Sequence, residues 1–300
     1  MNFSSYFNIL NHGETFEFFD INVETDTKKF VDPYCIARSS NPHCRKMNET
    51  LDAFMSRLMS AIIQKNHMQA HSLCSNFNEP KGTGIGYSKN KLDGRGAADK
   101  LSEVFLQGLR DSIAVARGYV KRIEECGIFC EGIDRDIISD ITINITRKHL
   151  ITFTQEQCQK YGIPMRRTDE KIVYFCEIDK EWKFDYFELP HVAQSMGQTE
   201  QYIILIPEDL LPRFPTYGYR YFFTNIATMK YKLEAIKENL SCVFKSKKGV
   251  FRVNVKQMRL IEKYQCSKIN LNRFLNSYPN AIEEYRKVAD LRYKKNFPSI

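Results

Sequence analysis

The spacing of the apolar residues changes near residue 165, and this change restricts the fold more than any other feature of the chain. Before it, apolar residues recur at every third or fourth position, as over residues 51–63, which is the period of a helix that buries one face. After it, short runs of β-branched and aromatic residues alternate with turns, a pattern typical of strands. We therefore predict an α+β fold, with a helix-rich N-terminal half and a mixed β-sheet with helices in the C-terminal half.

Several segments carry these patterns clearly. KIVYFCEI and WKFDYFEL predict one hairpin, and CVFKSKKGVFRVNV predicts a second hairpin with a basic tip. Further strands are predicted at residues 16–23, 128–130 and 202–206. Helices are predicted at residues 97–126, broken at Gly108 and Gly118, from the aspartate segment after residue 130 to about residue 161, and at residues 226–240. The predicted division separates residues 1–165, a mainly helical part with an N-terminal strand and a glycine-rich loop, from residues 166–300, a mixed β/α part with a basic C-terminal segment. One continuous domain is the alternative.

The composition places the chain among cytoplasmic proteins. Its nine cysteines are odd in number, scattered and without a CxxC pair, which is typical of reduced thiols rather than of a disulfide framework. The longest apolar runs are far shorter than the roughly 18 residues that suggest a membrane helix. The first residues lack a basic segment followed by an apolar stretch, so no secretory signal and no membrane contact are expected.

Charge is distributed unevenly along the chain. The whole sequence has 44 Lys and Arg against 36 Asp and Glu, whereas residues 230–300 have 17 against 6, a net charge of +11 that leaves −3 for residues 1–229. A basic segment of this kind favours binding to nucleic acid or another polyanion, and a solvated helical face is the alternative. The predicted contacts are Lys245, Lys247, Lys248 and Arg252 in the second hairpin, and Arg292, Lys294 and Lys295 near the C-terminus.

An aspartate cluster stands in CEGIDRDIISDITINIT. On a helical wheel Asp136, Asp140 and Arg147 fall opposite the isoleucine stripe, and Asp134 is placed to cap the helix. Capping and a solvated face are the favoured interpretation, because carboxylates stabilise the positive end of a helix. The alternative is a Mg²⁺-dependent nuclease that holds its cation with Asp134, Asp136 and Asp140. In that alternative, Glu181 and Lys183 of an ExK triplet would assist.

A glycine-rich segment, EPKGTGIGYSKNKLDGRGAADK, precedes a predicted helix. Glycines, lysines and a helix N-terminus together suit a phosphate group, but neither GxxxxGK[ST] nor GxGxxG is present. The favoured interpretation is a flexible surface loop, with phosphate contact as the alternative. The candidate phosphate contacts are Lys81, Gly84, Gly86, Lys89, Lys91 and Arg95.

His67, His71 and Cys74 are spaced to share one face of a helix and could supply zinc ligands. Because this face continues the apolar stripe of the preceding helix, half-buried histidines that line the core are the favoured interpretation.

Two stretches, GIDRDIISDITINITRKHLITFTQEQC and LIPEDLLPRFPTYGYRYFF, are similar to uncharacterised bacterial proteins encoded among phage-defence and mobile-element genes. The resemblance implies an antiviral defence role and assigns no activity or site residue. The sequence therefore predicts a defence-type protein that binds nucleic acid or another polyanion, as a component of a multi-protein system with a protein partner. The metal-dependent nuclease is the alternative.

Overall fold

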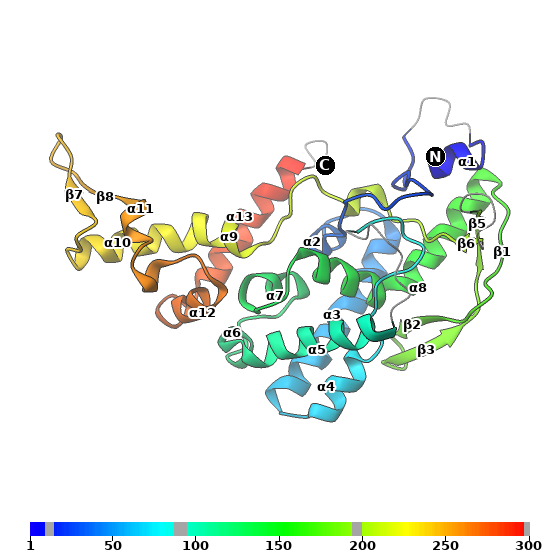
Figure 1. Cartoon of the computed structure of the whole chain (residues 1–300), viewed down its shortest axis with the longest axis horizontal. Coiled ribbons are helices and arrows are strands. Elements are labelled where there is room, and N and C mark those ends of the chain that lie inside the picture. The colour runs from blue at the N-terminus through cyan, green and yellow to red at the C-terminus, as the bar shows by residue number, and fades with distance from the viewer. Residues whose placement is uncertain (10–14, 87–94, 194–199, 297–300) are drawn as a thin grey trace.

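The structure, a computed structural model, describes residues 1–9, 15–86, 95–193 and 200–296. Its longest element is α8 (Arg135–Tyr161), which crosses the molecule and is surrounded by the other N-terminal helices (Figure 1). These helices are α1 (Phe3–Tyr6), α2 (Pro33–Ile36), α3 (Pro42–Ile63), α4 (His67–Cys74), α5 (Arg95–Asp111), α6 (Ile113–Ala116) and α7 (Ile123–Phe129). Isoleucine and threonine side chains on all sides of α8 are buried, so this helix is the centre of the core.

The strands form four separate two-stranded antiparallel ladders. They are β1 (Arg166–Arg167) with β4 (Glu188–Leu189), β2 (Ile172–Cys176) with β3 (Glu181–Asp185), β5 (His191–Val192) with β6 (Gln201–Tyr202), and β7 (Val243–Lys245) with β8 (Phe251–Val253). The β2–β3 hairpin packs on α8, and Trp182 donates a hydrogen bond from its indole to the carbonyl oxygen of Leu73 at 2.8 Å. One hydrophobic cluster continues from Phe54 of α3 through Phe175 of β2.

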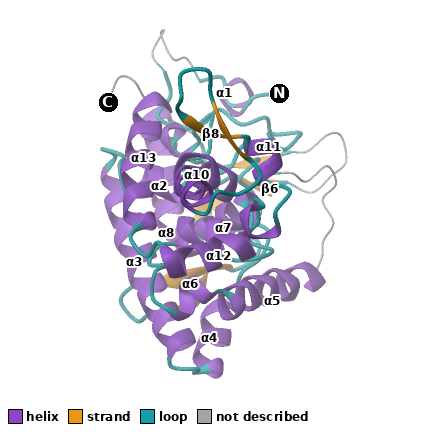
Figure 2. Ribbon diagram, turned by 90° about the vertical axis from the view of Figure 1, so that its left-hand side faces the viewer, coloured by secondary structure: helices purple, strands orange, loops and turns teal. Residues whose placement is uncertain are grey.

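Residues 208–296 follow as a short 3₁₀ turn (Glu208–Leu210), α9 (Tyr219–Phe222), a π-helical turn (Phe223–Ala227), α10 (Thr228–Lys237), the β7–β8 hairpin, α11 (Val255–Met258), a second 3₁₀ turn (Glu262–Tyr264), α12 (Lys268–Ser277) and α13 (Ala281–Asn296). Figure 1 shows α10 and the β7–β8 hairpin extending to one end of the long axis, and Figure 2 views α10 from that end. We call residues 1–218 the body and residues 219–296 the C-terminal segment.

Two buried polar contacts attach the C-terminal segment to the body. Arg286 of α13 donates to the Oε1 atom of the fully buried Glu125 of α7 from Nε at 2.9 Å and from Nη2 at 2.6 Å. Lys268 of α12, also buried, donates from Nζ to the carbonyl oxygens of Cys130 at 2.9 Å and Ile133 at 2.6 Å. Because both cations satisfy acceptors that would otherwise be buried unpaired, the segment is held in a defined orientation.

The predicted α+β class is confirmed, with helices in the N-terminal half and small antiparallel ladders plus helices in the C-terminal half. Three predicted strands are wrong in detail. Residues 16–23 form two isolated bridges, Phe18 with Pro207 and Asn22 with Asn2. Residues 128–129 belong to α7, whose first turn is closed by Glu125. Of residues 202–206 only Tyr202 is in a ladder, while the others are buried in an irregular extended segment.

The predicted helix over residues 97–126 is divided into α5, α6 and the start of α7. Ser112 begins α6 by accepting a hydrogen bond from the backbone of Val115, and Gly118 follows it with a φ of 70°. The predicted break at Gly118 is confirmed, whereas the predicted break at Gly108 is wrong, because Gly108 lies inside α5, where it allows the close approach of the Glu131 carbonyl oxygen. In the part of the chain that the structure describes, every helix is too short or too polar to span a bilayer.

Candidate nucleic-acid interface

The β7–β8 hairpin combines cations with exposed aromatic rings. In its register Phe244 is opposite Arg252 and Lys245 is opposite Phe251, and directly opposed side chains of an antiparallel pair share a face. Each face of the ribbon therefore carries one ring and one cation. The Lys245 ammonium lies 5.7 Å from the centroid of the Phe251 ring, a cation–π distance.

The tip of the hairpin is a tight basic turn. Ser246 donates from its backbone nitrogen to the carbonyl oxygen of Val250 at 2.9 Å, and Gly249 adopts a φ of 78° that favours glycine. Lys247 and Lys248 stand at this turn and are exposed. Four of the predicted polyanion contacts are thus gathered on one protruding ribbon.

The base of the hairpin is fixed to the rest of the segment. Asn254 donates from its backbone nitrogen to the carbonyl oxygen of the buried Cys242 at 2.9 Å, and Val243 and Val253 pack against the hydrophobic cluster. In contrast, Phe244 and Phe251 are 50% and 54% exposed. Burial of such large rings would stabilise the fold, so their exposure suggests that they contact another molecule.

The remaining predicted contacts lie elsewhere. Arg292, Lys294 and Lys295 are in the last turns of α13, which ends well away from the hairpin (Figure 1). The Arg292 guanidinium lies 3.7 Å from the centroid of the Tyr221 ring and so packs within the segment, whereas Lys294 and Lys295 are exposed. The seven predicted cations form two separate groups, and the hairpin group includes the exposed rings of Phe244 and Phe251.

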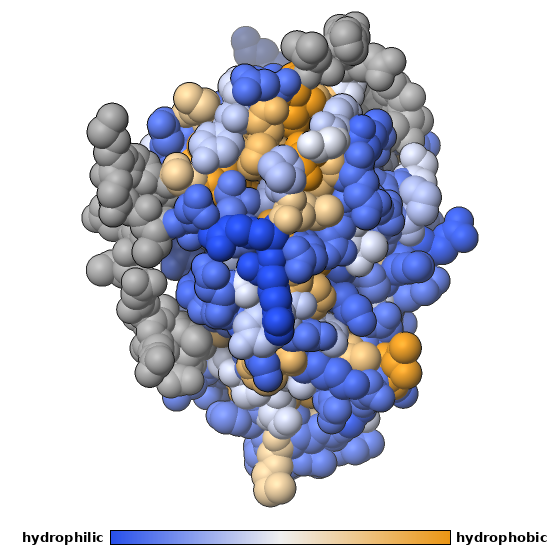
Figure 3. All heavy atoms as spheres, turned by 90° about the vertical axis from the view of Figure 1, so that its right-hand side faces the viewer, coloured by the Kyte–Doolittle hydropathy of each residue, from blue (hydrophilic) through white to orange (hydrophobic). Residues whose placement is uncertain are grey.

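Figure 3 shows the opposite end of the molecule, which faces right in Figure 1. Hydrophilic side chains cover most of this face, with smaller apolar areas among them. Several charged residues of the body are paired, such as Arg166 with Glu200 at 2.6 Å and Lys160 with Glu17 at 2.6 Å. Paired charges attract a polyanion less than the cations of the hairpin do.

The aspartate cluster is placed differently from the prediction. Asp134 occupies the N-cap position of α8, but its side chain makes no capping hydrogen bond and instead accepts from the Nζ of Lys268 at 3.2 Å. Arg147, predicted on a solvated face, is buried and donates to the carbonyl oxygen of Val173 at 2.9 Å and to Asn144 Oδ1 at 2.6 Å. The prediction failed because α8 is covered on nearly all sides, so no face of it is fully solvated.

Asp136 and Asp140 stand one turn apart on α8, and both are half-buried. Burial, with the negative charges of Glu79 and Asp136, raises the pKa of Asp140 to about 7. The expectation of an outward-facing, solvated Asp140 is therefore wrong. Within the described ranges, the His, Cys, Asp and Glu side chains include no group of three or more that could together hold a metal ion.

The ExK triplet lies on β3, where Glu181 pairs with Cys176 and Lys183 pairs with Tyr174 in the ladder. Lys183 forms an ion pair with Asp179 in the turn of its own hairpin, and this contact lowers the pKa of Asp179. The Glu181 side chain is exposed. The triplet is thus part of an ordinary polar strand, with its lysine engaged by the adjoining turn.

The first part of the glycine-rich segment is packed rather than loose. Gly82 accepts a hydrogen bond from Ile204 at 2.9 Å, and Gly84 accepts one from Thr27 at 2.9 Å. A Cβ atom on Gly84 would lie 2.9 Å from the Ile21 side chain, so close packing explains this glycine, and the predicted flexible loop is wrong here. Lys81 pairs with Glu170 at 3.2 Å, Gly86 donates to Thr27, and Arg95 begins α5. Lys89 and Lys91 lie outside the described residues.

The histidine prediction is also corrected. His67 and His71 are exposed on α4, while Cys74 of the same helix is buried. The apolar stripe of α3 ends at the turn near Lys65, whose φ is 55°, so α4 presents a different face to the core. All nine cysteines are free thiols, and eight of them are buried.

Sequence reasoning found the hairpin cations but missed Phe244 and Phe251. The signal was present in CVFKSKKGVFRVNV, because strand alternation with a turn at residues 247–249 puts each phenylalanine opposite a cation. Exposure of both rings could not be read from the pattern, since a phenylalanine in a strand is more often buried.

Comparisons with known proteins give one match. A family model described as a domain of unknown function, DUF8370, matches residues 8–218, which is more than half of the chain. Neither the curated proteins nor the solved structures give a match. The match covers nearly all of the body and none of the C-terminal segment, so the hairpin lies outside it. By its body, the chain belongs to the DUF8370 family of domains of unknown function.

Proposed function

We propose that this protein binds nucleic acid through the β7–β8 hairpin, as a non-catalytic component of a defence-type assembly. The observation that carries the proposal is the pairing, on each face of a protruding ribbon, of a cation with an exposed aromatic ring. Cations neutralise phosphates, and aromatic rings stack on bases. A two-stranded ribbon also has dimensions that a nucleic-acid groove admits.

The distribution of charge supports the same proposal. The hairpin lies within residues 230–300, which have a net charge of +11, whereas residues 1–229 have −3. A positive end on a nearly neutral remainder orients the molecule toward a polyanion during encounter. The defence role itself stays a prediction from resemblance, since the matching family is one of unknown function.

Binding should be measured by filter retention of a labelled oligonucleotide at about 50 mM and 200 mM salt. Four phosphate contacts from the hairpin predict a loss of affinity of roughly a hundredfold between these conditions. The variant with both Lys247→Ala and Lys248→Ala should bind more weakly and reduce the salt slope by about 2. The matched control replaces Lys294 and Lys295 by alanine, which removes the same charge from α13 and should have the smaller effect. Equal effects of the two variants would mean that binding follows net charge and not the hairpin.

A protein partner is the outcome favoured if no salt-sensitive binding is seen. In that case the exposed rings of the hairpin would contact another subunit, and copurification with mass spectrometry would identify it. The two outcomes are separable because nucleic-acid binding falls with salt through release of counterions, whereas contact between apolar surfaces does not weaken in this way.

The metal-dependent nuclease has less support. Its best remaining feature is Asp140, whose pKa is raised by burial and by the charges of Glu79 and Asp136. Raised values favour a protonated carboxyl, and a carboxyl must be ionised to hold Mg²⁺. A Mg²⁺-dependent nuclease activity that is present in the wild type and absent in a folded Asp140→Asn variant would establish this function instead.

A further inference from the structure

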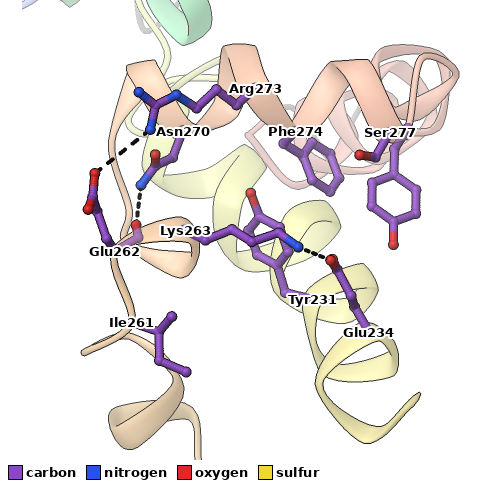
Figure 4. A pocket seen from close by; sticks show the side chains of 10 residues that line it. Tyr231, Glu234, Ile261, Glu262, Lys263, Asn270, Arg273, Phe274 and Ser277 are labelled. Carbon is purple, nitrogen blue, oxygen red and sulfur yellow. Dashed lines mark hydrogen bonds and ion pairs between the residues drawn. The ribbon is translucent and has the colours of Figure 1, made fainter. Parts of the chain in front are cut away.

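A cavity of about 450 Å³ opens between α10, the 3₁₀ turn at Glu262–Tyr264 and α12 (Figure 4). This volume is within the range of about 300–1,000 Å³ found for small-molecule sites. All of its lining residues belong to the C-terminal segment, and the β7–β8 hairpin is inserted between α10 and the turn that form two of its walls. The cavity and the ribbon that carries the basic tip thus belong to the same part of the chain.

One wall of the cavity is aromatic. The rings of Phe274 and Tyr278 are stacked, with centroids 4.8 Å apart and planes inclined by 29°, and Tyr231 meets Phe274 edge-on at 5.2 Å. Tyr231 and Phe274 are buried and Tyr278 is half-buried. Tyr278, the ring of the three that is partly exposed, is held by its stacking on Phe274 and can offer a rigid face to a planar ligand at little cost in conformational entropy.

The rim of the cavity is polar and balanced in charge. Lys263 pairs with Glu234, and Arg273 lies 3.9 Å from Glu262, so two cations and two carboxylates give a net charge of zero. Ser277 adds a hydroxyl, which can donate or accept. Asn270 is occupied in holding the turn, because its amide donates to the carbonyl oxygens of Glu262 at 2.7 Å and Gln265 at 3.1 Å.

We propose that this cavity binds a nucleobase. A base presents a planar aromatic face to the ring wall and an edge with both donors and acceptors to the rim, and it has no net charge. A simple anion would meet two carboxylates here, and a simple cation would meet a lysine and an arginine. The proposal rests on the proposed function, since the hairpin would hold the phosphates of the strand whose base enters the cavity.

The base could belong to a single strand or to a free nucleotide, and two measurements distinguish these sources. In the first, fluorescence anisotropy compares a single-stranded oligonucleotide with an abasic strand of equal length and charge. Both strands satisfy the hairpin cations equally, so the base-bearing strand should bind at least about fivefold more tightly through stacking. In the second, saturation-transfer NMR tests binding of 5′-AMP alone.

Variants show which aromatic ring stacks on the base. Tyr278→Ala should reduce the preference for the base-bearing strand and leave the abasic affinity unchanged, and any preference that remains belongs to the hairpin rings. Tyr278→Phe keeps the ring and should retain the wild-type difference, which shows that the alanine result reflects the ring and not a loss of folding. Phe184→Ala is the matched control, because it removes an exposed ring from the body and leaves both the cavity and the hairpin intact.

Each outcome decides the proposal separately from the proposed function. Equal, salt-sensitive binding of the two strands, with no AMP signal, overturns the cavity assignment and leaves only phosphate binding by the hairpin cations. A base preference that survives Tyr278→Ala undiminished and disappears in Phe244→Ala also overturns it, because the base then stacks on the ribbon. AMP binding that Tyr278→Ala abolishes, without a base preference in the strand, supports the cavity with a free nucleotide as its ligand.

Discussion

The body and the C-terminal segment differ in where their polar and apolar side chains lie. In the body, buried polar groups have specific partners, such as Arg147 with Val173 and Asn144, and Thr50 with His149 at 2.9 Å. In the C-terminal segment, several cations and rings, such as Lys248 and Phe251, are exposed. Among the described residues, half of the 16 exposed large apolar side chains lie in its 78 residues. They are Met229, Leu233, Phe244, Val250, Phe251, Leu260, Ile269 and Leu291.

This difference separates what folding requires from what folding leaves free. A buried polar network costs free energy unless every member is satisfied, so its residues are determined by the packing around them. An exposed phenylalanine or an unburied lysine contributes little to folding, and its identity must come from what the surface contacts. We therefore assign stability to the body and recognition to the C-terminal segment, and three comparisons between matched residues test this assignment.

The largest effect is expected for Arg147→Ala. This truncation leaves the carbonyl oxygen of Val173 and the side-chain oxygens of Asn144 and Asn78 without their buried donor, and should lower the free energy of unfolding by about 4 kcal/mol. Arg252→Ala, the matched change on the hairpin, should alter it by no more than about 0.5 kcal/mol. Urea denaturation measures both. If the two variants are equally stable, the body network does not contribute as described.

A smaller effect is expected at two glycines of positive φ. Gly84→Ala combines a φ of 61° with a contact of 2.9 Å to Ile21 and should cost about 3 kcal/mol. Gly249→Ala has a similar φ of 78° but only the Lys245 side chain at 3.9 Å, so it should cost about 1 kcal/mol. The difference between their thermal unfolding midpoints isolates packing from backbone strain. Identical unfolding midpoints of the two variants would show that Gly84 is not closely packed against Ile21.

The sequence predicted the fold class because periodicity depends on local geometry that each segment carries itself. The seam over residues 51–63 lies inside α3, and KIVYFCEI with WKFDYFEL forms β2–β3 in the expected antiparallel register. What failed depends on contacts distant in sequence. Arg147 looked solvated on a helical wheel because nothing in α8 reveals that Val173 and Asn78 will cover that face.

The candidate site shows the same division. Alternation predicted the hairpin and its basic tip, since both are local. The cavity was missed because Tyr231, Lys263 and Tyr278 come from three elements that are brought together only by the fold. Its charge balance also depends on that assembly, because each cation meets a carboxylate from another element.

The smallest effect concerns carboxylates and depends on pH. The pKa of Asp140 is raised by burial and by Glu79 and Asp136 to about 7, above the value of about 3.9 in an unfolded chain. The folded protein therefore binds this proton more tightly, and its stability falls as the pH rises from about 4 to about 7. Asp140→Asn removes the contribution, so at pH 8 the variant should be more stable than the wild type by about 1 kcal/mol, a value reduced because solvent reaches part of the side chain.

The matched change in the C-terminal segment is Glu262→Gln. The Glu262 side chain is 85% exposed and lies on the rim of the cavity, so its replacement should leave the dependence of stability on pH as it is in the wild type. Unfolding midpoints of both variants at pH 5, 6, 7 and 8 make the comparison. If the stability of Asp140→Asn alone depends less on pH than that of the wild type, the buried position of Asp140 destabilises its charged form, and the exposed position of Glu262 does not. If Asp140→Asn instead follows the wild-type profile, Asp140 titrates as a solvated residue, and the contrast between the two regions does not extend to their acidic side chains.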